Sequence, residues 1–465
     1  MSNIICGILN TKKKFYFSFA LDSKILTIQP VKMNRTASFI FKHDFEDYPF
    51  LMKRMNISGE TNENRYIEFI NVKFASIGRG CFQAWVPAYI LGLSNTIEPI
   101  AKPNKITEIL FKGECIDRMI SARKIISDNL DYDNSKLTVN VDYGNEKIEN
   151  FKYEKYDCYF VPSWTMPTGM KDVKNVLNVS TYLKIKSEKV ISISKIIELY
   201  KDFEKLFSFG CHRQHVEFDS IIIKQIIPIN YFDKIEDTVI QFKLVISSPD
   251  EEYDIPKIGK TLKITDEIDN IPKLINSLKN DNFIILSFPF NFHEDSIVDN
   301  DKYINVSSSF ESAFDKLFPN YKSEKSSDFK FVKESIINFI IEQSNNKSFN
   351  KKRREYFKDF KEYLELYEGR LEEKLQFAYK KYNYIIKDDI NYFKSEFKVD
   401  EITYEKIACK FAKKRNHLSH GSKLEQFSDI EVLAYSLLKK INYAMILEKS
   451  GFNEERIAEI IKQIF

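Results

Sequence analysis

One polar stretch near the C-terminus reads Arg415-Asn416-His417-Leu418-Ser419-His420-Gly421. The residues before it are apolar at near-helical spacing: Ile402, Ile407, Ala408, Phe411 and Ala412. This spacing predicts a helix over 401–416 that Asp400 caps and Gly421 stops. Arg415 should then lie in a last helical turn, and His420 at or just beyond the helix end.

Arg415 and His420 together suit a phosphodiester. A guanidinium holds two non-bridging phosphate oxygens in a fork. A histidine titrates near neutral pH and moves a proton to or from a ribose hydroxyl or a leaving oxygen. Five residues are fewer than two helical turns, so both side chains can point at one place without a metal ion. The basic run Lys410, Lys413 and Lys414 adds candidates for RNA phosphate contacts.

A structural interpretation stands beside the chemical one. An Arg-x4-His spacing is a short pattern that also arises by chance. Cationic side chains near a helix C-terminus can satisfy the last carbonyls and the helix dipole. The spacing of Arg415 and His420 alone leaves both interpretations open.

The stretch resembles the Arg-polar-x3-His signature of HEPN domains, small all-helical modules found in many prokaryotic defence and toxin ribonucleases. Its local order, with Arg415 and Asn416 followed by His420 and Gly421, closely resembles the motif of the ApeA-like HEPN group. That resemblance implies a C-terminal HEPN domain behind a β-rich N-terminal domain, acting in abortive antiphage defence. The motif covers seven residues, and its helical context covers 296–465.

The resemblance also implies roles for the residues of the motif. HEPN ribonucleases pair two bundles so that both motifs meet at the interface. Arg415 would bind the scissile phosphate, His420 would act as general base or acid, and Asn416 would orient the phosphate or the histidine. His417 occupies a variable position and has at most an accessory role. Glu311 is a candidate partner of Arg415 across the bundle, with a solvated surface carboxylate as the alternative.

The resemblance therefore implies a metal-independent endoribonuclease without a cofactor. Its products would carry a 2′,3′-cyclic phosphate and a 5′-hydroxyl. The expected partners are RNA, with transfer RNA as one candidate, a second copy of the chain or a higher homo-oligomer, and a phage-derived trigger. The alternative function is a non-catalytic HEPN scaffold that binds RNA or a protein.

Composition sets broad bounds on the whole chain. Its 465 residues suit two or three domains. Hydrophobic residues make up 43% and charged residues 29%, which indicates a folded globular protein. The net charge of +3 gives no global attraction to nucleic acid, so any basic surface is local. No apolar run approaches membrane-spanning length and the start does not read as a signal peptide, so we expect a cytoplasmic protein without membrane contact.

Residues 1–290 read as a β-rich sensing or regulatory region with two candidate subdomains, 1–188 and 189–290. Short runs of β-branched and aromatic residues, separated by turn residues, predict an antiparallel sandwich or barrel. The runs are 15–19, 25–28, 38–41, 66–74, 82–90, 106–111, 137–141 and 182–185, with further strands expected at 217–227, 238–247 and 283–290. Gly78-Arg79-Gly80 reads as a hairpin turn.

One amphipathic helix interrupts these strands. Its apolar stripe runs from Ile196 to Phe207, with Ser192 or Ser194 as cap and Gly210 as stop. Cys211, His212 and His215 follow closely and raise a zinc site as a minor alternative. No second Cys/His pair lies nearby in the sequence to complete four ligands, so our prediction is that the protein binds no metal.

From residue 296 the apolar period becomes helical. The predicted helices are 307–318, 329–343, 351–380 with a kink at Gly369, 380–397, the motif helix, 429–449 capped by Ser428, and 454–464 capped by Asn453. Short connections between them predict an up-down bundle. The fold class expected for the whole chain is α+β multidomain: a β-rich N-terminal region followed by an all-α HEPN bundle over 296–465.

Overall fold

The computed structural model describes residues 4–10, 15–30, 54–77, 81–93, 102–120, 130–133, 136–139, 149–165, 178–231, 234–247, 253–264, 267–281, 283–321, 327–365, 371–398, 402–420 and 426–465. The chain divides into two compact units. The β unit comprises Met1–Cys211, His215–Ile258 and Lys263–Pro272. The helical unit comprises His212–Gln214, Gly259–Leu262 and Lys273–Phe465. The helical unit therefore includes residues on both sides of the 290–296 boundary.

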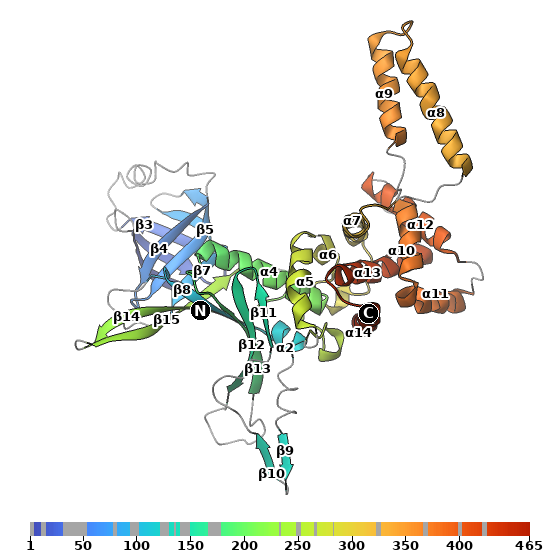
Figure 1. The fold of residues 1–465 in the computed structure, drawn as a ribbon. Helices are drawn as coiled ribbons and strands as arrows, with labels where there is room; N and C mark the ends of the chain where they lie inside the picture. Colours follow the sequence, from blue (N-terminus) through green and yellow to red (C-terminus); the bar gives the residue numbers. More distant parts are fainter. Residues whose placement is uncertain are drawn as a thin grey trace. The chain divides into compact units, whose positions relative to one another are not determined.

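The described strands of the β unit pair antiparallel, and thirteen of them form one sheet in the order β11-β12-β13-β8-β14-β15-β7-β5-β4-β1-β2-β3-β6 (Figure 1). The strands are β1 Ile4–Leu9, β2 Phe15–Ala20, β3 Ile25–Pro30, β4 Met55–Thr61, β5 Tyr66–Ile77, β6 Phe82–Trp85, β7 Ala88–Gly92, β8 Ile106–Lys112, β11 Glu149–Tyr153, β12 Tyr156–Thr165, β13 Asn178–Lys186, β14 Ser220–Tyr231 and β15 Lys234–Ile246. A separate hairpin joins β9 Leu130–Asp133 to β10 Lys136–Val139.

One end of the sheet closes on itself, because β6 pairs with β3 and also with β5. Closure removes the free edges that would otherwise expose unpaired backbone groups. Alternate residues of β2, beginning with Phe15, point inward and are buried. Phe17 and Phe19 both meet Phe69 edge to face, with ring centroids 5.3 and 5.1 Å apart. The predicted β-rich, barrel-like region is therefore confirmed.

Helix α4, Ile193–Cys211, packs on the open part of this sheet. Its Phe203 ring contacts Phe111 of β8 and Tyr153 of β11, with centroids 6.0 and 5.8 Å apart. The predicted amphipathic helix is present, and Ser192 accepts a hydrogen bond from the backbone N–H of Lys195. A further short helix, α2 Glu114–Met119, lies beside α4.

The helical unit contains helices from α5 to α14. Their bounds are α5 Ile271–Lys279, α6 Phe283–Leu286, α7 Asn300–Leu317, α8 Ser327–Asn345, α9 Lys351–Glu365, α10 Leu371–Lys381, α11 Asn383–Phe397, α12 Tyr404–Ser419, α13 Asp429–Lys449 and α14 Glu454–Ile464. Helix α13 is the most enclosed of these and packs against α7, α11, α12 and α14. The predicted helical C-terminal region is confirmed.

Aromatic stacking fixes α7 against the two helices that flank the motif. The buried Tyr303 ring of α7 stacks on Phe411 of α12 at 4.4 Å and on Tyr435 of α13 at 5.9 Å between centroids. The side-chain amide of Asn442 on α13 donates to the Val306 carbonyl of α7 at 2.8 Å. These contacts hold Glu311 of α7 within reach of the end of α12.

Local hydrogen bonds decide where several helices begin. Asp299 caps α7 by accepting from the Lys302 N–H at 2.8 Å, so α7 begins seven residues before the predicted start. Asn453 caps α14 as predicted, accepting from Arg456 N–H at 2.9 Å. Ser428 precedes α13 as predicted, and its backbone N–H donates to Glu431 at 2.8 Å.

Two predictions of local structure are wrong. Phe283 to Phe290 is not a strand, because Asp281 accepts from the Phe283 and Ile284 N–H groups and starts the short helix α6. Helix α12 starts at Tyr404 because Thr403, not Asp400, supplies the capping oxygen.

The 351–380 segment forms α9 and α10 on either side of 366–370, which lie outside the described residues. The predicted strand 38–41, the turn 78–80 and Gly421 also lie outside them.

None of the helices in the described part of the chain is both long enough and apolar enough to span a lipid bilayer.

Candidate phosphodiester site at the end of helix α12

The end of α12 presents the polar stretch. Ile407, Ala408 and Phe411 are buried on one side of the helix, which fixes its rotation in the bundle. Arg415 lies near the end of the helix, and His420 is the first residue after it, as the sequence predicts. The His420 backbone N–H donates to the Asn416 carbonyl at 3.2 Å, so the backbone is ordered through His420.

Arg415 reaches α7. Its Nη2 donates to the Glu311 carboxylate at 3.0 Å, which is the pairing that the family resemblance offered beside a solvated surface carboxylate. The two side chains are about equally accessible, 30% for Arg415 and 34% for Glu311. Arg415 Nη1 lies 3.4 Å from Asn416 Oδ1, and Arg415 Nε is buried without a hydrogen-bond partner among the described residues. The guanidinium is therefore anchored on one side, and its remaining Nη hydrogens are the donors left for another acceptor.

The imidazoles face away from Arg415. Side chains advance about 100° per residue around a helix, so His417 lies about 160° around α12 from Arg415, and His420 about 140°. His417, His420 and Asn416 are all exposed. Within one chain the Arg415 guanidinium pairs with Glu311 of α7, while the imidazoles of His417 and His420 are exposed to solvent.

Three lysines extend the exposed side of α12. Lys406, Lys410 and Lys413 precede His417 at spacings of four, three and four residues, and all four side chains are exposed. Such spacing places them on one helical face. We call this set, Lys406, Lys410, Lys413 and His417, the basic strip of α12.

Lys414 does not belong to the basic strip. Its side chain is 6% exposed, and its Nζ lies 4.8 Å from the centre of the Phe427 ring and 3.4 Å from the Gln426 carbonyl oxygen. The spacing Ile407, Phe411, Lys414 is that of an apolar helical stripe, and this signal was available in the sequence. Lys414 therefore anchors the segment after α12, and only Lys410 and Lys413 remain candidates for RNA contacts.

The residues of the minor zinc alternative have separate surroundings. His215 of the β unit has Nδ1 2.8 Å from the Glu204 carboxylate. His212 belongs to the helical unit, where its ring lies 4.3 Å from Phe288 and 4.7 Å from Phe465 between centroids. Burial, followed by the neighbouring Lys439 and Arg213 cations, holds the pKa of His212 well below its usual value. Each imidazole thus has a structural environment of its own.

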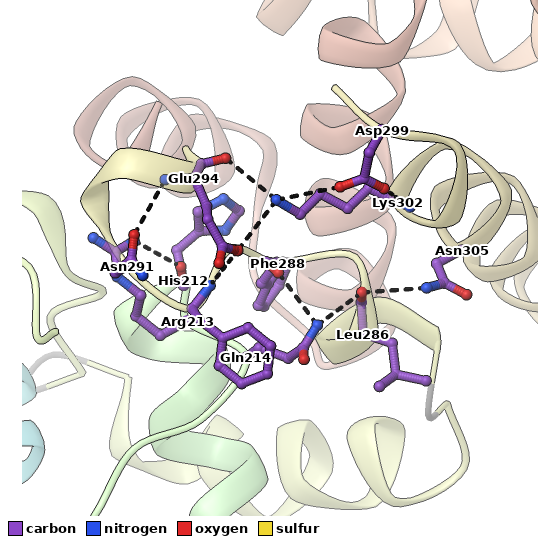
Figure 2. A network of polar contacts seen from close by, with 11 residues as sticks. His212, Arg213, Gln214, Leu286, Phe288, Asn291, Glu294, Asp299, Lys302 and Asn305 are labelled. Atoms are coloured by element: carbon purple, nitrogen blue, oxygen red, sulfur yellow. Dashed lines mark hydrogen bonds and ion pairs between the residues drawn. The ribbon is translucent and has the colours of Figure 1, made fainter. Parts of the chain in front are cut away.

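A second charged group of the helical unit lies near His212, and sequence reasoning missed it (Figure 2). Lys302 of α7 is 9% exposed, and its Nζ lies 3.3 Å from Glu294 Oε2 and 3.7 Å from Asp299 Oδ2. The pKa of Lys439 is lowered to about 8, chiefly by burial; the Asp295 carboxylate opposes this shift, and the Lys302, Arg213 and Lys440 cations add to it. The sequence held one local signal for this cluster: Asp299 can cap a helix that begins at residue 300, which places Lys302 in the first turn of that helix.

Comparison with known proteins gives the β unit a family. The chain has a β-rich region followed by a helical bundle, and the bundle carries an Arg-x4-His stretch. These features define a class of two-domain proteins, but they do not by themselves define an activity. Residues 42–225, from before β4 into β14, match the ApeA N-terminal domain 1. The chain carries this domain, so the resemblance to the ApeA-like family, read from the C-terminal stretch, is confirmed at the other end of the chain.

The match is confined to that domain. It suggests a protein of an antiphage defence family, and it leaves the helical unit and the HEPN assignment outside its range. No curated protein and no solved structure matches the chain.

Proposed function

We propose that the protein is a metal-independent endoribonuclease of the HEPN type that acts in abortive antiphage defence. One observation carries this proposal: Arg415, Asn416 and His420 all lie at the end of α12, where Glu311 anchors the guanidinium. The ApeA N-terminal domain supports the defence role. In this proposal the β unit senses infection and restrains the helical unit until a phage-derived trigger arrives.

Each residue has one chemical task in the proposed reaction. The free donors of Arg415 bind the non-bridging oxygens of the scissile phosphate. An imidazole from His420 removes the proton of the ribose 2′-hydroxyl, whose oxygen attacks phosphorus. A second imidazolium returns a proton to the departing 5′-oxygen, which leaves a 2′,3′-cyclic phosphate and a 5′-hydroxyl. Asn416 orients the phosphate or the histidine.

The directions of the side chains support a site shared by two chains. Arg415 and His420 lie about 140° apart around α12, so the imidazole of one chain does not face the guanidinium of the same chain. Two α12 ends related by a twofold axis would supply two arginines and two histidines to one phosphate. The basic strip, with Lys410 and Lys413, would then extend phosphate contacts along the RNA. Transfer RNA is the candidate substrate, from resemblance.

The test incubates the purified full chain with total cellular RNA and EDTA, with and without lysate from phage-infected cells. The wild type is compared with Arg415→Ala, His420→Ala and His293→Ala. His293 is an exposed histidine of the helical unit that lies outside α12, so His293→Ala is the matched control. We expect the wild type and the control to leave 2′,3′-cyclic phosphates, and both motif variants to leave RNA intact.

Cleavage that persists in both motif variants would refute the proposal. Cleavage that needs added divalent metal would refute its metal-independent mechanism. RNA binding or dimerisation without turnover, in the presence of the infected lysate, would instead favour the non-catalytic scaffold.

A further inference from the structure

Helices α8 and α9 form an antiparallel hairpin within the helical unit (Figure 1). Each packs chiefly against the other, and neither makes an extensive contact with another helix or strand among the described residues. The seam between them contains Ile337 and Ile340 of α8 and Phe357 and Leu364 of α9, which are the less exposed apolar residues of the pair. Two helices alone bury only this narrow seam.

Each helix of the hairpin also carries a second apolar stripe. On α8 it comprises Val332, Ile336 and Phe339, exposed by 52, 41 and 56%. Both stripes have the spacing i, i+4, i+7, which places three side chains on one helical face. The stripe of α9 consists of Tyr356 at 52%, Phe360 at 61% and Tyr363 at 73%.

The two stripes share one face of the hairpin. At about 100° per residue, the α8 stripe lies about 100° around its axis from the seam, and the α9 stripe about 85° in the same rotational sense. Because the helices run antiparallel, equal rotations from the seam bring both stripes to the same side. We call these six residues, Val332, Ile336, Phe339, Tyr356, Phe360 and Tyr363, the apolar face.

The size of the apolar face is that of an interface. A buried aromatic side chain covers about 150–250 Å², so four that are more than half exposed leave about 400–500 Å² open. Val332 and Ile336 add to this area. The total reaches the upper end of the ~300–600 Å² that the largest apolar patch of a monomer shows, and it approaches the ~800 Å² per partner of a stable interface.

Charge along the hairpin identifies the partner. The tip, residues 342–354, carries five lysines and arginines against Glu342 alone, a net charge of +4. The rest of the hairpin, 327–341 and 355–365, carries four lysines against six carboxylates, a net charge of −2. A second copy turned end for end places each positive tip over the other's negative base. In such an isologous contact the same surface is used by both copies, so the apolar face and the hairpin charges supply both sides of the interface.

We propose that the apolar face is a self-association surface, on which two α8–α9 hairpins pack antiparallel into a four-helix bundle. RNA is the less suitable occupant, since the α8 stripe has aliphatic residues and the cations outside the tip are outnumbered by carboxylates. This inference concerns association alone and does not depend on the ribonuclease activity.

The test measures the mass of the full chain by sedimentation equilibrium. Phe339→Glu combined with Phe360→Glu puts carboxylates into the centre of the contact, and should raise the dissociation constant about 100-fold or more. Phe331→Glu is the matched control, because Phe331 is 71% exposed on the same helix but lies about 110° around it from the stripe. It should leave association unchanged. Circular dichroism checks that both variants keep their helix content.

Charge reversal provides a second test. Lys351→Glu with Lys352→Glu should weaken association about tenfold, and adding Asp359→Lys with Glu362→Lys should restore it. A wild type that stays monomeric, or a Phe339→Glu/Phe360→Glu variant that associates like the wild type, would overturn the proposal. If that variant keeps its mass and instead loses binding in an RNA gel shift, the face belongs to RNA and the proposal also fails.

Discussion

Two groups of charged side chains in the helical unit differ in their access to solvent. The rim group comprises Glu311, Arg415, Asn416, His417 and His420 around the end of α12. The buried group comprises two buried side chains, His212 and Lys302, with the partly exposed carboxylates Glu294 and Asp299 beside the Lys302 ammonium. Both combine cations, carboxylates and imidazoles, so composition does not distinguish them.

The exposure of the cationic side chain does distinguish them. Lys302 is 9% exposed, and Glu294 and Asp299 surround its ammonium group. Arg415 is 30% exposed, and its guanidinium keeps Nη hydrogens beyond those that reach Glu311 and Asn416. A charge whose interactions are satisfied inside the fold stabilises it, whereas one that keeps free donors at the surface is available to a ligand. The rim group should therefore affect activity, and the buried group should affect stability.

Arg415→Ala should give the largest effect and sharpen this contrast. Removing the phosphate-binding fork should lower the RNA cleavage rate about 1,000-fold, because the charge that develops on the phosphate loses its donors. The free energy of unfolding should change by no more than about 1 kcal/mol, since the pair with Glu311 is partly exposed. Single-turnover cleavage and urea unfolding measure the two quantities. An active variant, or one unfolded at room temperature, would break the comparison.

Lys302→Met should show the opposite pattern. Methionine keeps the apolar stem and removes the ammonium group, which leaves Glu294 and Asp299 without their cation. We expect the free energy of unfolding to fall by about 2 kcal/mol while cleavage per folded molecule stays the same. Lys387→Met on α11 is the matched control, because Lys387 is exposed and its loss should cost less than about 0.5 kcal/mol. If Lys302→Met and Lys387→Met lower the free energy of unfolding equally, Lys302 is not a stabilising charge of the buried group.

His212 makes the buried group sensitive to pH. Its pKa is lowered in the folded state, so the unfolded chain binds one more proton as the pH falls below about 6.5. Stability from this residue is fully present above that pH and declines below it by up to about 1.4 kcal/mol per pH unit. His212→Phe should remove that part of the slope. Thermal unfolding of both proteins between about pH 7.5 and 5 tests it, and identical slopes would contradict the assignment.

The sequence predicted the parts of the site that rest on local periodicity. The helix that ends at the motif, and the positions of Arg415 and His420 at its end, follow from apolar spacing over 401–416. Burial of Lys414 had the same signal, since it continues the stripe of Ile407 and Phe411. It was overlooked because a basic residue among lysines reads as surface.

Other features depend on contacts that sequence spacing does not specify. The apolar run from Phe283 to Phe290 fits either a strand or a buried helix, and the Asp281 cap decides between them. Closure of the barrel requires β6 to pair with both β3 and β5, a choice made by side-chain packing in three dimensions. Lys302 of α7 contacts Glu294, which lies in the short 3-10 helix Phe292–Glu294 just before α7. This contact depends on the geometry of the connection between the two helices. Periodicity gives the elements, and packing between them gives these contacts.

Glu311→Gln should give the smallest effect and tests the boundary between the two groups. The glutamine carbonyl can still accept from Arg415, but the negative charge that opposes an incoming phosphate is gone. One charge at this partly exposed position is worth about 1 kcal/mol, so KM for RNA should fall about fivefold with kcat nearly unchanged. Glu311→Ala removes the anchor as well, and should lower kcat because Arg415 loses its orientation. If both substitutions leave KM and kcat unchanged and only lower stability, Glu311 belongs with the structural charges of the buried group.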